Sequence, residues 1–277
     1  MRDGKGRKLL LTVIVWGLLF FVLLPLFWML LTAFRPSHEV MRIPPSIVPS
    51  ALTLEHVQHL LQDTPFLIYF RNSLVIAGIT TCFVIGIGTL AAYSLARFRY
   101  PGRETLAVLV LCSYLLPSVV LIIPVYLLMI TLGLSNSYAG LVLAYASFTL
   151  PYALWLLRSF MAAVPDDLEH AAMVDGASRM GAFFDVILPQ ALPGIISTTI
   201  FTFILSWNEY LFAQILVSTD EMRPLTTGVM NMLITSYTIE WSLLMAAAVL
   251  MSVPLIIVFA FLQRYLTVGF GSGAVKG

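Results

Sequence analysis

The sequence predicts an all-α membrane protein with six transmembrane helices, and three observations support this prediction. Hydrophobic residues make up 60% of the 277 residues and charged residues only 10%, whereas soluble domains carry roughly 25% charged residues. A bilayer span needs about 20 apolar residues, and five uncharged segments reach that length. The longest of these segments has room for two spans, which brings the expected number to six.

The expected spans follow one another along the chain. The first segment comes after the basic stretch MRDGKGRK, but it is too long for a signal peptide and has no small-x-small cleavage site, so we interpret it as an uncleaved span. The longest segment contains GLSNSY (Gly133–Tyr138), a turn-like sequence that divides it into two helices. The expected spans are 9–34, 72–96, two helices within 105–157, 186–208 and 241–263. Cys82 and Cys112 lie within these spans and are expected to be core residues.

The distribution of Lys and Arg predicts that both termini are cytoplasmic. With both ends inside, eleven Lys and Arg residues face the cytoplasm and four face outward. Cytoplasmic connections of membrane proteins carry the excess of these residues. We therefore expect a multi-pass protein of the inner or plasma membrane with this orientation.

The outer connection between the first two spans has local structure of its own. It contains the extended stretch PPSIVPS (Pro44–Ser50) and then TLEHVQHLL (Thr53–Leu61), in which Thr53 and Glu55 could open a short helix. The connection is either a cap over the bundle or a contact surface for an external partner, and the residues leave both interpretations open.

The longest cytoplasmic connection (161–193) interrupts the apolar chain with two short polar helices. The first is expected at Asp166–Asp175, where three acidic residues near the start complement the helix dipole. Leu168, Ala171 and Ala172 fall on one face at helical spacing, and alanines permit the close approach of another surface. Gly176 is suited to a left-handed C-cap.

The second helix of this connection is expected to begin at Ser178, which can act as its N-cap, and to end at Pro189. Taken alone, these residues fit a docking element for a partner and a loop that seals the cytoplasmic end of the bundle equally well.

The stretch EHAAMVDGAS followed by VILP resembles the signature of permease subunits of ATP-binding-cassette (ABC) importers: Glu-Ala-Ala, three residues, Gly, nine residues and Ile-x-Leu-Pro. Two positions depart from it: His170 stands where the family has glutamate, and Val186 where it has isoleucine. The resemblance implies a type I importer permease fold whose helix at Asp166–Asp175 is a coupling helix seated in a cleft of an ATPase subunit. The coupling residues it implies are Asp166, Asp167, Glu169, His170, Ala171, Ala172, Asp175, Gly176, Leu188 and Pro189.

The resemblance covers nearly the whole chain and is closest to the smaller permease of maltose-type carbohydrate importers. It implies a single transmembrane domain (1–277) with an N-terminal helix (9–34), a core module of about 69–264 and a cytoplasmic tail (265–277). In relatives the glycine-rich tail enters the interface between two ATPase subunits. The stretches that carry this resemblance are RNSLVIAG (Arg71–Gly78), AYSLARFRYPGR (Ala92–Arg103), LGLSNSYAGLVLAY (Leu132–Tyr145), WLLRSF (Trp155–Phe160), SWNEYLF (Ser206–Phe212) and the tail, with Gly273, Val275, Lys276 and Gly277 as its contact residues.

The chain carries no motif for catalysis. It has no G-x-x-x-x-G-K-[ST] to hold nucleotide phosphates and no H-E-x-x-H or G-x-S-x-G. We therefore expect no catalytic residue, metal or cofactor in this chain, with ATP and Mg bound by partner subunits, and its net charge of +1 indicates no nucleic acid. The expected partners are a second permease in a heterodimer, two ABC ATPase subunits, an external solute-binding protein, a carbohydrate and the lipid membrane.

One charge, Glu209 in SWNEY, interrupts a span. Ionisable residues within the membrane are functional candidates, and Trp207, Asn208 and Tyr210 beside it could stack on a sugar and bond to it. The alternative is a carboxylate paired within the bundle.

Two other classes of function stay open. An ion-coupled secondary transporter usually needs several buried carboxylates or histidines, but all four histidines lie outside the expected spans. A non-transporting scaffold gives no reason for the prolines within the spans. The sequence thus favours a permease subunit that carries a sugar or oligosaccharide inward, driven by separate ATPases.

Overall fold

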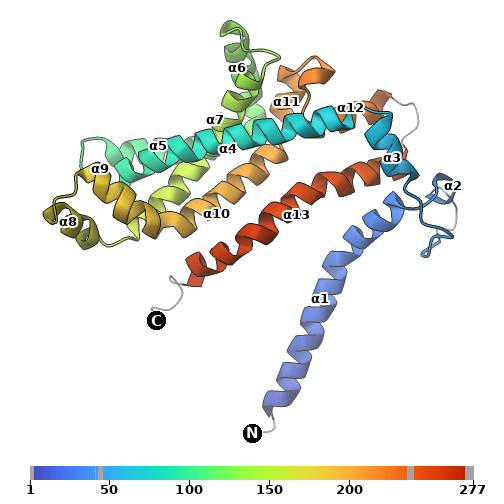
Figure 1. The fold of residues 1–277 in the computed structure, drawn as a ribbon, viewed down its shortest axis with the longest axis horizontal. Coiled ribbons are helices and arrows are strands. Elements are labelled where there is room, and N and C mark those ends of the chain that lie inside the picture. Colours follow the sequence, from blue (N-terminus) through green and yellow to red (C-terminus); the bar gives the residue numbers. More distant parts are fainter. Residues whose placement is uncertain (1–2, 41, 43–45, 236–239, 272–277) are drawn as a thin grey trace. The chain divides into compact units, whose positions relative to one another are not determined.

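The computed structural model describes residues 3–40, 42, 46–235 and 240–271, and every regular element in these ranges is a helix (Figure 1). Five helices are long and apolar enough to cross a membrane, or six if a bent pair counts as one span. The prediction of an all-α membrane protein is therefore confirmed. The long helices are α1 (Asp3–Ala33), α4 (Phe66–Arg97), α7 (Tyr138–Ala162), α10 (Leu188–Trp207) and α13 (Trp241–Gly271).

The chain forms two compact units, 1–67 with 229–254 and 68–228 with 255–277. In the first unit, α1 and the short helix α2 (Ser37–Val40) lead into the outer connection. The carboxylate of Glu39 in α2 is buried and accepts hydrogen bonds from the backbone N–H and the hydroxyl of Ser50. The Ser50 hydroxyl is the main cause that lowers the pKa of Glu39. This part of the connection is therefore folded on itself.

The helix predicted within the outer connection is confirmed as α3 (Glu55–Gln62). The Thr53 hydroxyl accepts a hydrogen bond from the backbone N–H of Glu55 at 3.1 Å, as expected for a residue that opens a helix. His56, on its inner side, is buried, and its Nε2 lies 2.9 Å from the backbone oxygen of Arg35.

The third span is broken, which the sequence prediction missed. The expected single helix before Gly133 consists of α5 (Arg103–Tyr114) and α6 (Ser118–Thr131), which meet at an angle of 101°. Pro117 stands at the N-cap of α6 with extended backbone. A residue before proline is disfavoured in the helical conformation, so the chain leaves the helix before Pro117 and restarts after it.

The second unit is built around α7. The most extensive packing in this unit joins α7 to α10, and α5 covers another side of α7. Leu157 and Met161 of α7 pack with Ile187 and Ala191 in one buried cluster. A second cluster joins α7 to α6 and to α11 (Leu211–Leu216). These contacts fix the helices from which the connection 161–193 projects.

Cys82 on α4 and Cys112 on α5 are free and exposed, so the expectation that they are core residues is wrong. Both spans are apolar on all sides, and such a sequence does not reveal which face points inward.

The connection 161–193 follows the prediction up to its last residues. It forms α8 (Asp166–Val174) and α9 (Arg179–Ala182), separated by Gly176 at a left-handed φ of 95°. The Ser178 hydroxyl caps α9 by accepting from the backbone N–H of Gly181.

The predicted end of the second helix at Pro189 is wrong, because α9 continues through a π-helical turn (Phe183–Ile187) into α10. Pro189 is the second residue of α10, which follows the π-helical turn without a break. We attribute the uninterrupted helix to the π-helical turn, whose wider hydrogen-bond pattern directly precedes the proline.

Candidate coupling site and outer loop

The inner face of α8 is tied to the C-terminal end of α4 by a buried carboxylate. Glu169 is only 4% exposed. Its Oε1 accepts a hydrogen bond from the Tyr93 hydroxyl at 2.6 Å, and its Oε2 lies 3.3 Å from Nε of Arg97. Arg97 also pairs with Asp166 and donates to the backbone oxygen of Val164 at 2.6 Å. One arginine of α4 therefore holds both the start and the middle of α8.

We call the pairing of Glu169 with Arg97 the lock between α8 and α4. Its opposite charges compensate one another in a site largely removed from water. The side chain of Arg97 is 6% exposed, and Tyr93 is buried. Burying an ion without a partner is strongly unfavourable, and removing one partner of a buried pair typically costs about 3–5 kcal/mol. The position of α8 on α4 thus depends on the pairing of Glu169 with Arg97.

The face of α8 that points away from α4 is exposed and partly apolar. Leu168 is 42% exposed, Val174 is 86% exposed, and Ala171 between them is also exposed. Ala172, which the sequence groups with Leu168 and Ala171, is half-buried. The three exposed residues, which we call the α8 stripe, repeat at helical spacing. Exposed apolar surface on a polar segment is typical of an interaction site.

The remaining residues of the signature fall into separate places. Asp167, His170 and Asp175 are exposed on α8. Leu188 is half-buried and packs against the core cluster of α7 and α10, whereas Pro189 is exposed. The tail residues Gly273, Val275, Lys276 and Gly277 lie outside the described residues.

The predicted pathway residues form a group at the outer end of α10. Trp207 is 2% exposed, and its ring packs against Phe70 and Phe203 with centroids 5.7 and 5.8 Å away. Asn208 is exposed and donates to the backbone oxygen of Ile204 in its own helix at 2.9 Å. Tyr210 is half-buried.

Glu209 is 9% exposed and binds backbone groups. Its carboxylate accepts hydrogen bonds from the N–H groups of Phe212 and Ala213 at 2.8 and 3.2 Å, so it caps the N-terminus of α11. The Thr226 hydroxyl donates to the backbone oxygen of Glu209 at 2.6 Å. These contacts match the alternative of a carboxylate paired within the bundle, and contact with substrate stays a prediction.

The structure also places two residues that sequence reasoning missed. Asn72 on α4 is fully buried and donates to the backbone oxygens of Glu221 and Arg223, each at 2.8 Å. Its side-chain oxygen accepts from the Tyr138 hydroxyl at 2.7 Å. One asparagine thus joins α4, α7 and the loop 217–224. In the sequence, the only indication of this role is an asparagine at the start of an apolar span, in the stretch RNSLVIAG.

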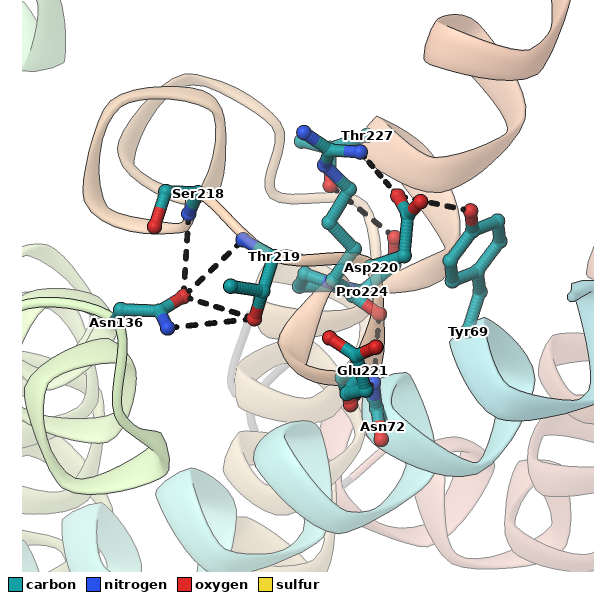
Figure 2. Close-up of polar contacts among 10 residues, drawn as sticks. Tyr69, Asn72, Asn136, Ser218, Thr219, Asp220, Glu221, Pro224 and Thr227 are labelled. Atoms are coloured by element: carbon teal, nitrogen blue, oxygen red, sulfur yellow. Dashed lines mark hydrogen bonds and ion pairs between the residues drawn. The ribbon is translucent and has the colours of Figure 1, made fainter.

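Asn136 holds the other side of this loop, as Figure 2 shows. Its backbone has a left-handed φ of 52°, which asparagine tolerates. The side-chain oxygen accepts from the backbone N–H of Ser218 at 3.1 Å and of Thr219 at 3.4 Å. Asp220 then pairs with Arg223 and accepts from the Tyr69 hydroxyl. The loop 217–224 is therefore fixed to α4 and to the turn before α7.

Asn72→Ala is expected to destabilise this outer loop strongly. The change leaves two partly buried carbonyls and one hydroxyl without the Asn72 amide, and an unsatisfied buried group costs about 1–3 kcal/mol. Because water reaches part of the loop, we expect a loss of about 2–4 kcal/mol in the free energy of unfolding. Thermal unfolding in detergent measures this as a fall in Tm.

Asn208→Ala is the matched control, since Asn208 is exposed and bonds only within its own helix. Its Tm should stay close to that of the wild type. Equal Tm values for the two variants would contradict the proposed role of Asn72.

Apolar spans around a core helix, with a polar helix pair that projects from them, define a multi-pass membrane protein. Residues 84–269 match the family described as "Binding-protein-dependent transport system inner membrane component". The chain therefore belongs to this family.

Named relatives are similar over almost their whole length. The trehalose/maltose transport system permease protein MalG of Thermococcus litoralis is 32% identical over 279 residues, 100% of both chains. The diacetylchitobiose uptake system permease protein DasC of Streptomyces coelicolor is 35% identical over 253 residues, 91% of each chain. A solved bacterial ABC transporter that imports alginate shares the fold, with a TM-score of 0.78 at 22% identity over 96% of this chain and 99% of the other.

Membership of this family distinguishes between the two classes of transporter that the sequence left open. Its members are inner-membrane components of binding-protein-dependent transport systems, so this chain is a permease subunit of an ABC importer. The ion-coupled secondary transporter is not supported.

Proposed function

We propose that this permease carries a sugar or oligosaccharide into the cell and that an ATPase subunit docks on the α8 stripe. The observation that carries the proposal is the division of α8 into two faces. Its inner face is locked to α4 through Glu169 and Arg97, while Leu168, Ala171 and Val174 face outward. A helix held on one side and open on the other can receive a partner and transmit its motion.

The relatives support the substrate class and the partners. Their names include trehalose, maltose and diacetylchitobiose, and a neighbouring structure contains alginate with a periplasmic protein. We therefore infer a carbohydrate substrate, a second permease, two ATPase subunits that bind ATP and Mg, and an external solute-binding protein. Lys and Arg are in excess in the termini and in the connections that lie on the same side of the membrane as α8 in the expected topology. This excess supports a cytoplasmic location of both termini.

The mechanism follows from the contacts of α8. Closure of the ATPase dimer pushes the α8 stripe, and the lock between Glu169 and Arg97 passes this displacement to the cytoplasmic end of α4. The left-handed Gly176 and the helix from α9 to α10 join α8 to a second span. Both spans then change their orientation, and hydrolysis returns them.

The docking surface is tested by Ala171→Glu combined with Val174→Glu. Both side chains are exposed, so folding should be unaffected, but two carboxylates in an apolar contact lack partners when buried. We expect at least a tenfold loss of ATPase subunits that co-purify with the permease from the native membrane. The measurement is the ratio of ATPase to permease after purification in mild detergent.

Val48→Glu is the control, because Val48 in the outer connection is 78% exposed and belongs to the other side of the expected topology. Its ATPase content should equal that of the wild type. Full recovery of the ATPase with the α8 variant would overturn the docking surface.

A further inference from the structure

A polar pocket of about 650 Å³ lies between the turn that joins α4 to α5 and the helices α8 and α9. The pocket shares Asp166, Glu169 and His170 with the coupling residues, but it contains none of the α8 stripe on which docking is proposed. Its lining consists of Ala96, Arg97, Arg99, Arg103, Asp166, Glu169, His170 and Arg179.

The pocket has more positive charge than its carboxylates neutralise. Four arginines face the two carboxylates of Asp166 and Glu169, and Arg97 already pairs with both. In the described part of the chain, Arg99 and Arg179 have no carboxylate partner. The Arg179 guanidinium instead lies over the Phe98 ring, 4.8 Å from its centroid, and this contact orients it.

The other two arginines, Arg103 and Arg97, differ in whether their N–H donors are already hydrogen-bonded. Arg103 pairs with Glu104, which lies outside the pocket and is shared with Arg158. The buried Nε of Arg97 is near enough to Glu169 for an ion pair, but it makes no hydrogen bond.

We propose that this pocket binds a phosphate group, either of an anionic lipid headgroup or of a free phosphorylated compound. Guanidinium groups bind phosphate oxygens through two parallel hydrogen bonds. Because Asp166 and Glu169 repel an anion, the phosphate lies on the side of Arg99 and Arg179. Basic pockets between spans on the cytoplasmic side are suited to lipid headgroups.

A lipid is the nearer source of this phosphate. Only the residues 98–102 separate α4 from α5, and a connection this short between two spans stays at the membrane surface. A headgroup there contacts both this turn and α8, so bound lipid would hold the coupling helix in place. The site does not depend on ATPase docking, and it stands if that proposal fails.

The test compares a double variant, Arg99→Gln with Arg179→Gln, with the wild-type chain in native mass spectrometry. The probes are phosphatidylglycerol, phosphatidylcholine and inorganic phosphate, each added to delipidated protein. We expect the wild type to retain phosphatidylglycerol and the double variant to retain at least tenfold less. Competition by millimolar phosphate would identify a free phosphorylated ligand, and its absence a lipid headgroup.

The control variant, Lys8→Gln with Arg42→Gln, removes the same charge from two exposed positions outside the pocket. It should retain phosphatidylglycerol within twofold of the wild type. A second variant, Arg99→Lys with Arg179→Lys, keeps the charge and should retain an intermediate amount. Equal retention by the Gln variant and the wild type, an equal loss in the control, or no binding of either anion to the wild type would overturn the proposal.

Discussion

Glu169→Ala is expected to release α8 from α4 and to uncouple the permease from its ATPase. The change removes the acceptor of the Tyr93 hydroxyl and one carboxylate partner of a buried arginine. Breaking such a pair costs about 3–5 kcal/mol. Arg97 retains Asp166 and the Val164 carbonyl, so we expect the lower end, about 3 kcal/mol.

Hydrogen exchange measures this release directly. The amides of α8 open locally, and a loss of about 3 kcal/mol raises their exchange rate on the order of 100-fold. In the assembled transporter, ATP hydrolysis should continue while transport falls at least tenfold. Glu169→Gln should have a smaller effect, because its amide oxygen still accepts from Tyr93.

Asp167→Ala is the control on the same helix, since Asp167 is exposed and, like Glu169, lies in the first turn. Both changes remove one negative charge near the helix N-terminus, so a general loss of helix stability affects both. Equal exchange rates in the two variants would show that the lock with Arg97 does not hold α8.

The inward orientation of the Glu169 side chain could not be predicted from the sequence, although the helix that carries it could. Helical periodicity predicted α8 within one residue of its observed end, and Gly176 was correctly expected in the left-handed conformation. The inward face could not be derived, because the partner Tyr93 is 76 positions away in the sequence.

The spans themselves were predictable because apolar length is a local property of the sequence. The break at Pro117 was missed because prolines are common within spans, and only the angle between α5 and α6 separates a kink from a broken helix. Glu209 was identified as an unusual charge, but its acceptance of backbone N–H groups three and four residues ahead is a capping contact that depends on where α11 begins.

The buried amide of Asn72 illustrates the same limit. An asparagine at the start of an apolar span is visible in the sequence, yet its partners Glu221 and Arg223 lie about 150 positions later. Contacts of this kind require the tertiary structure, since no spacing in the sequence brings the two segments together.

Gly194→Ala is expected to force α7 and α10 apart. A Cβ on Gly194 would overlap Cβ, Cγ and Cδ2 of Phe160. Cβ of Phe160 is bonded to the backbone of α7, so a change of the ring's rotamer can move Cγ and Cδ2 but leaves the overlap with Cβ. Overpacking usually costs about 1–3 kcal/mol, and we expect about 3 kcal/mol here, because α7 and α10 form the most extensive packing of the second unit.

Gly86→Ala is the matched control, because a Cβ at Gly86 of α4 meets no atom within 4 Å. Alanine favours a helix over glycine by about 0.8–1.0 kcal/mol, so this control should keep or raise the Tm while Gly194→Ala lowers it by several degrees. Combining Gly194→Ala with Phe160→Ala removes the overlapping ring and should recover part of the loss. Additive effects of the two changes would mean that Phe160 is not the obstacle and that the close approach of α7 to α10 does not require glycine.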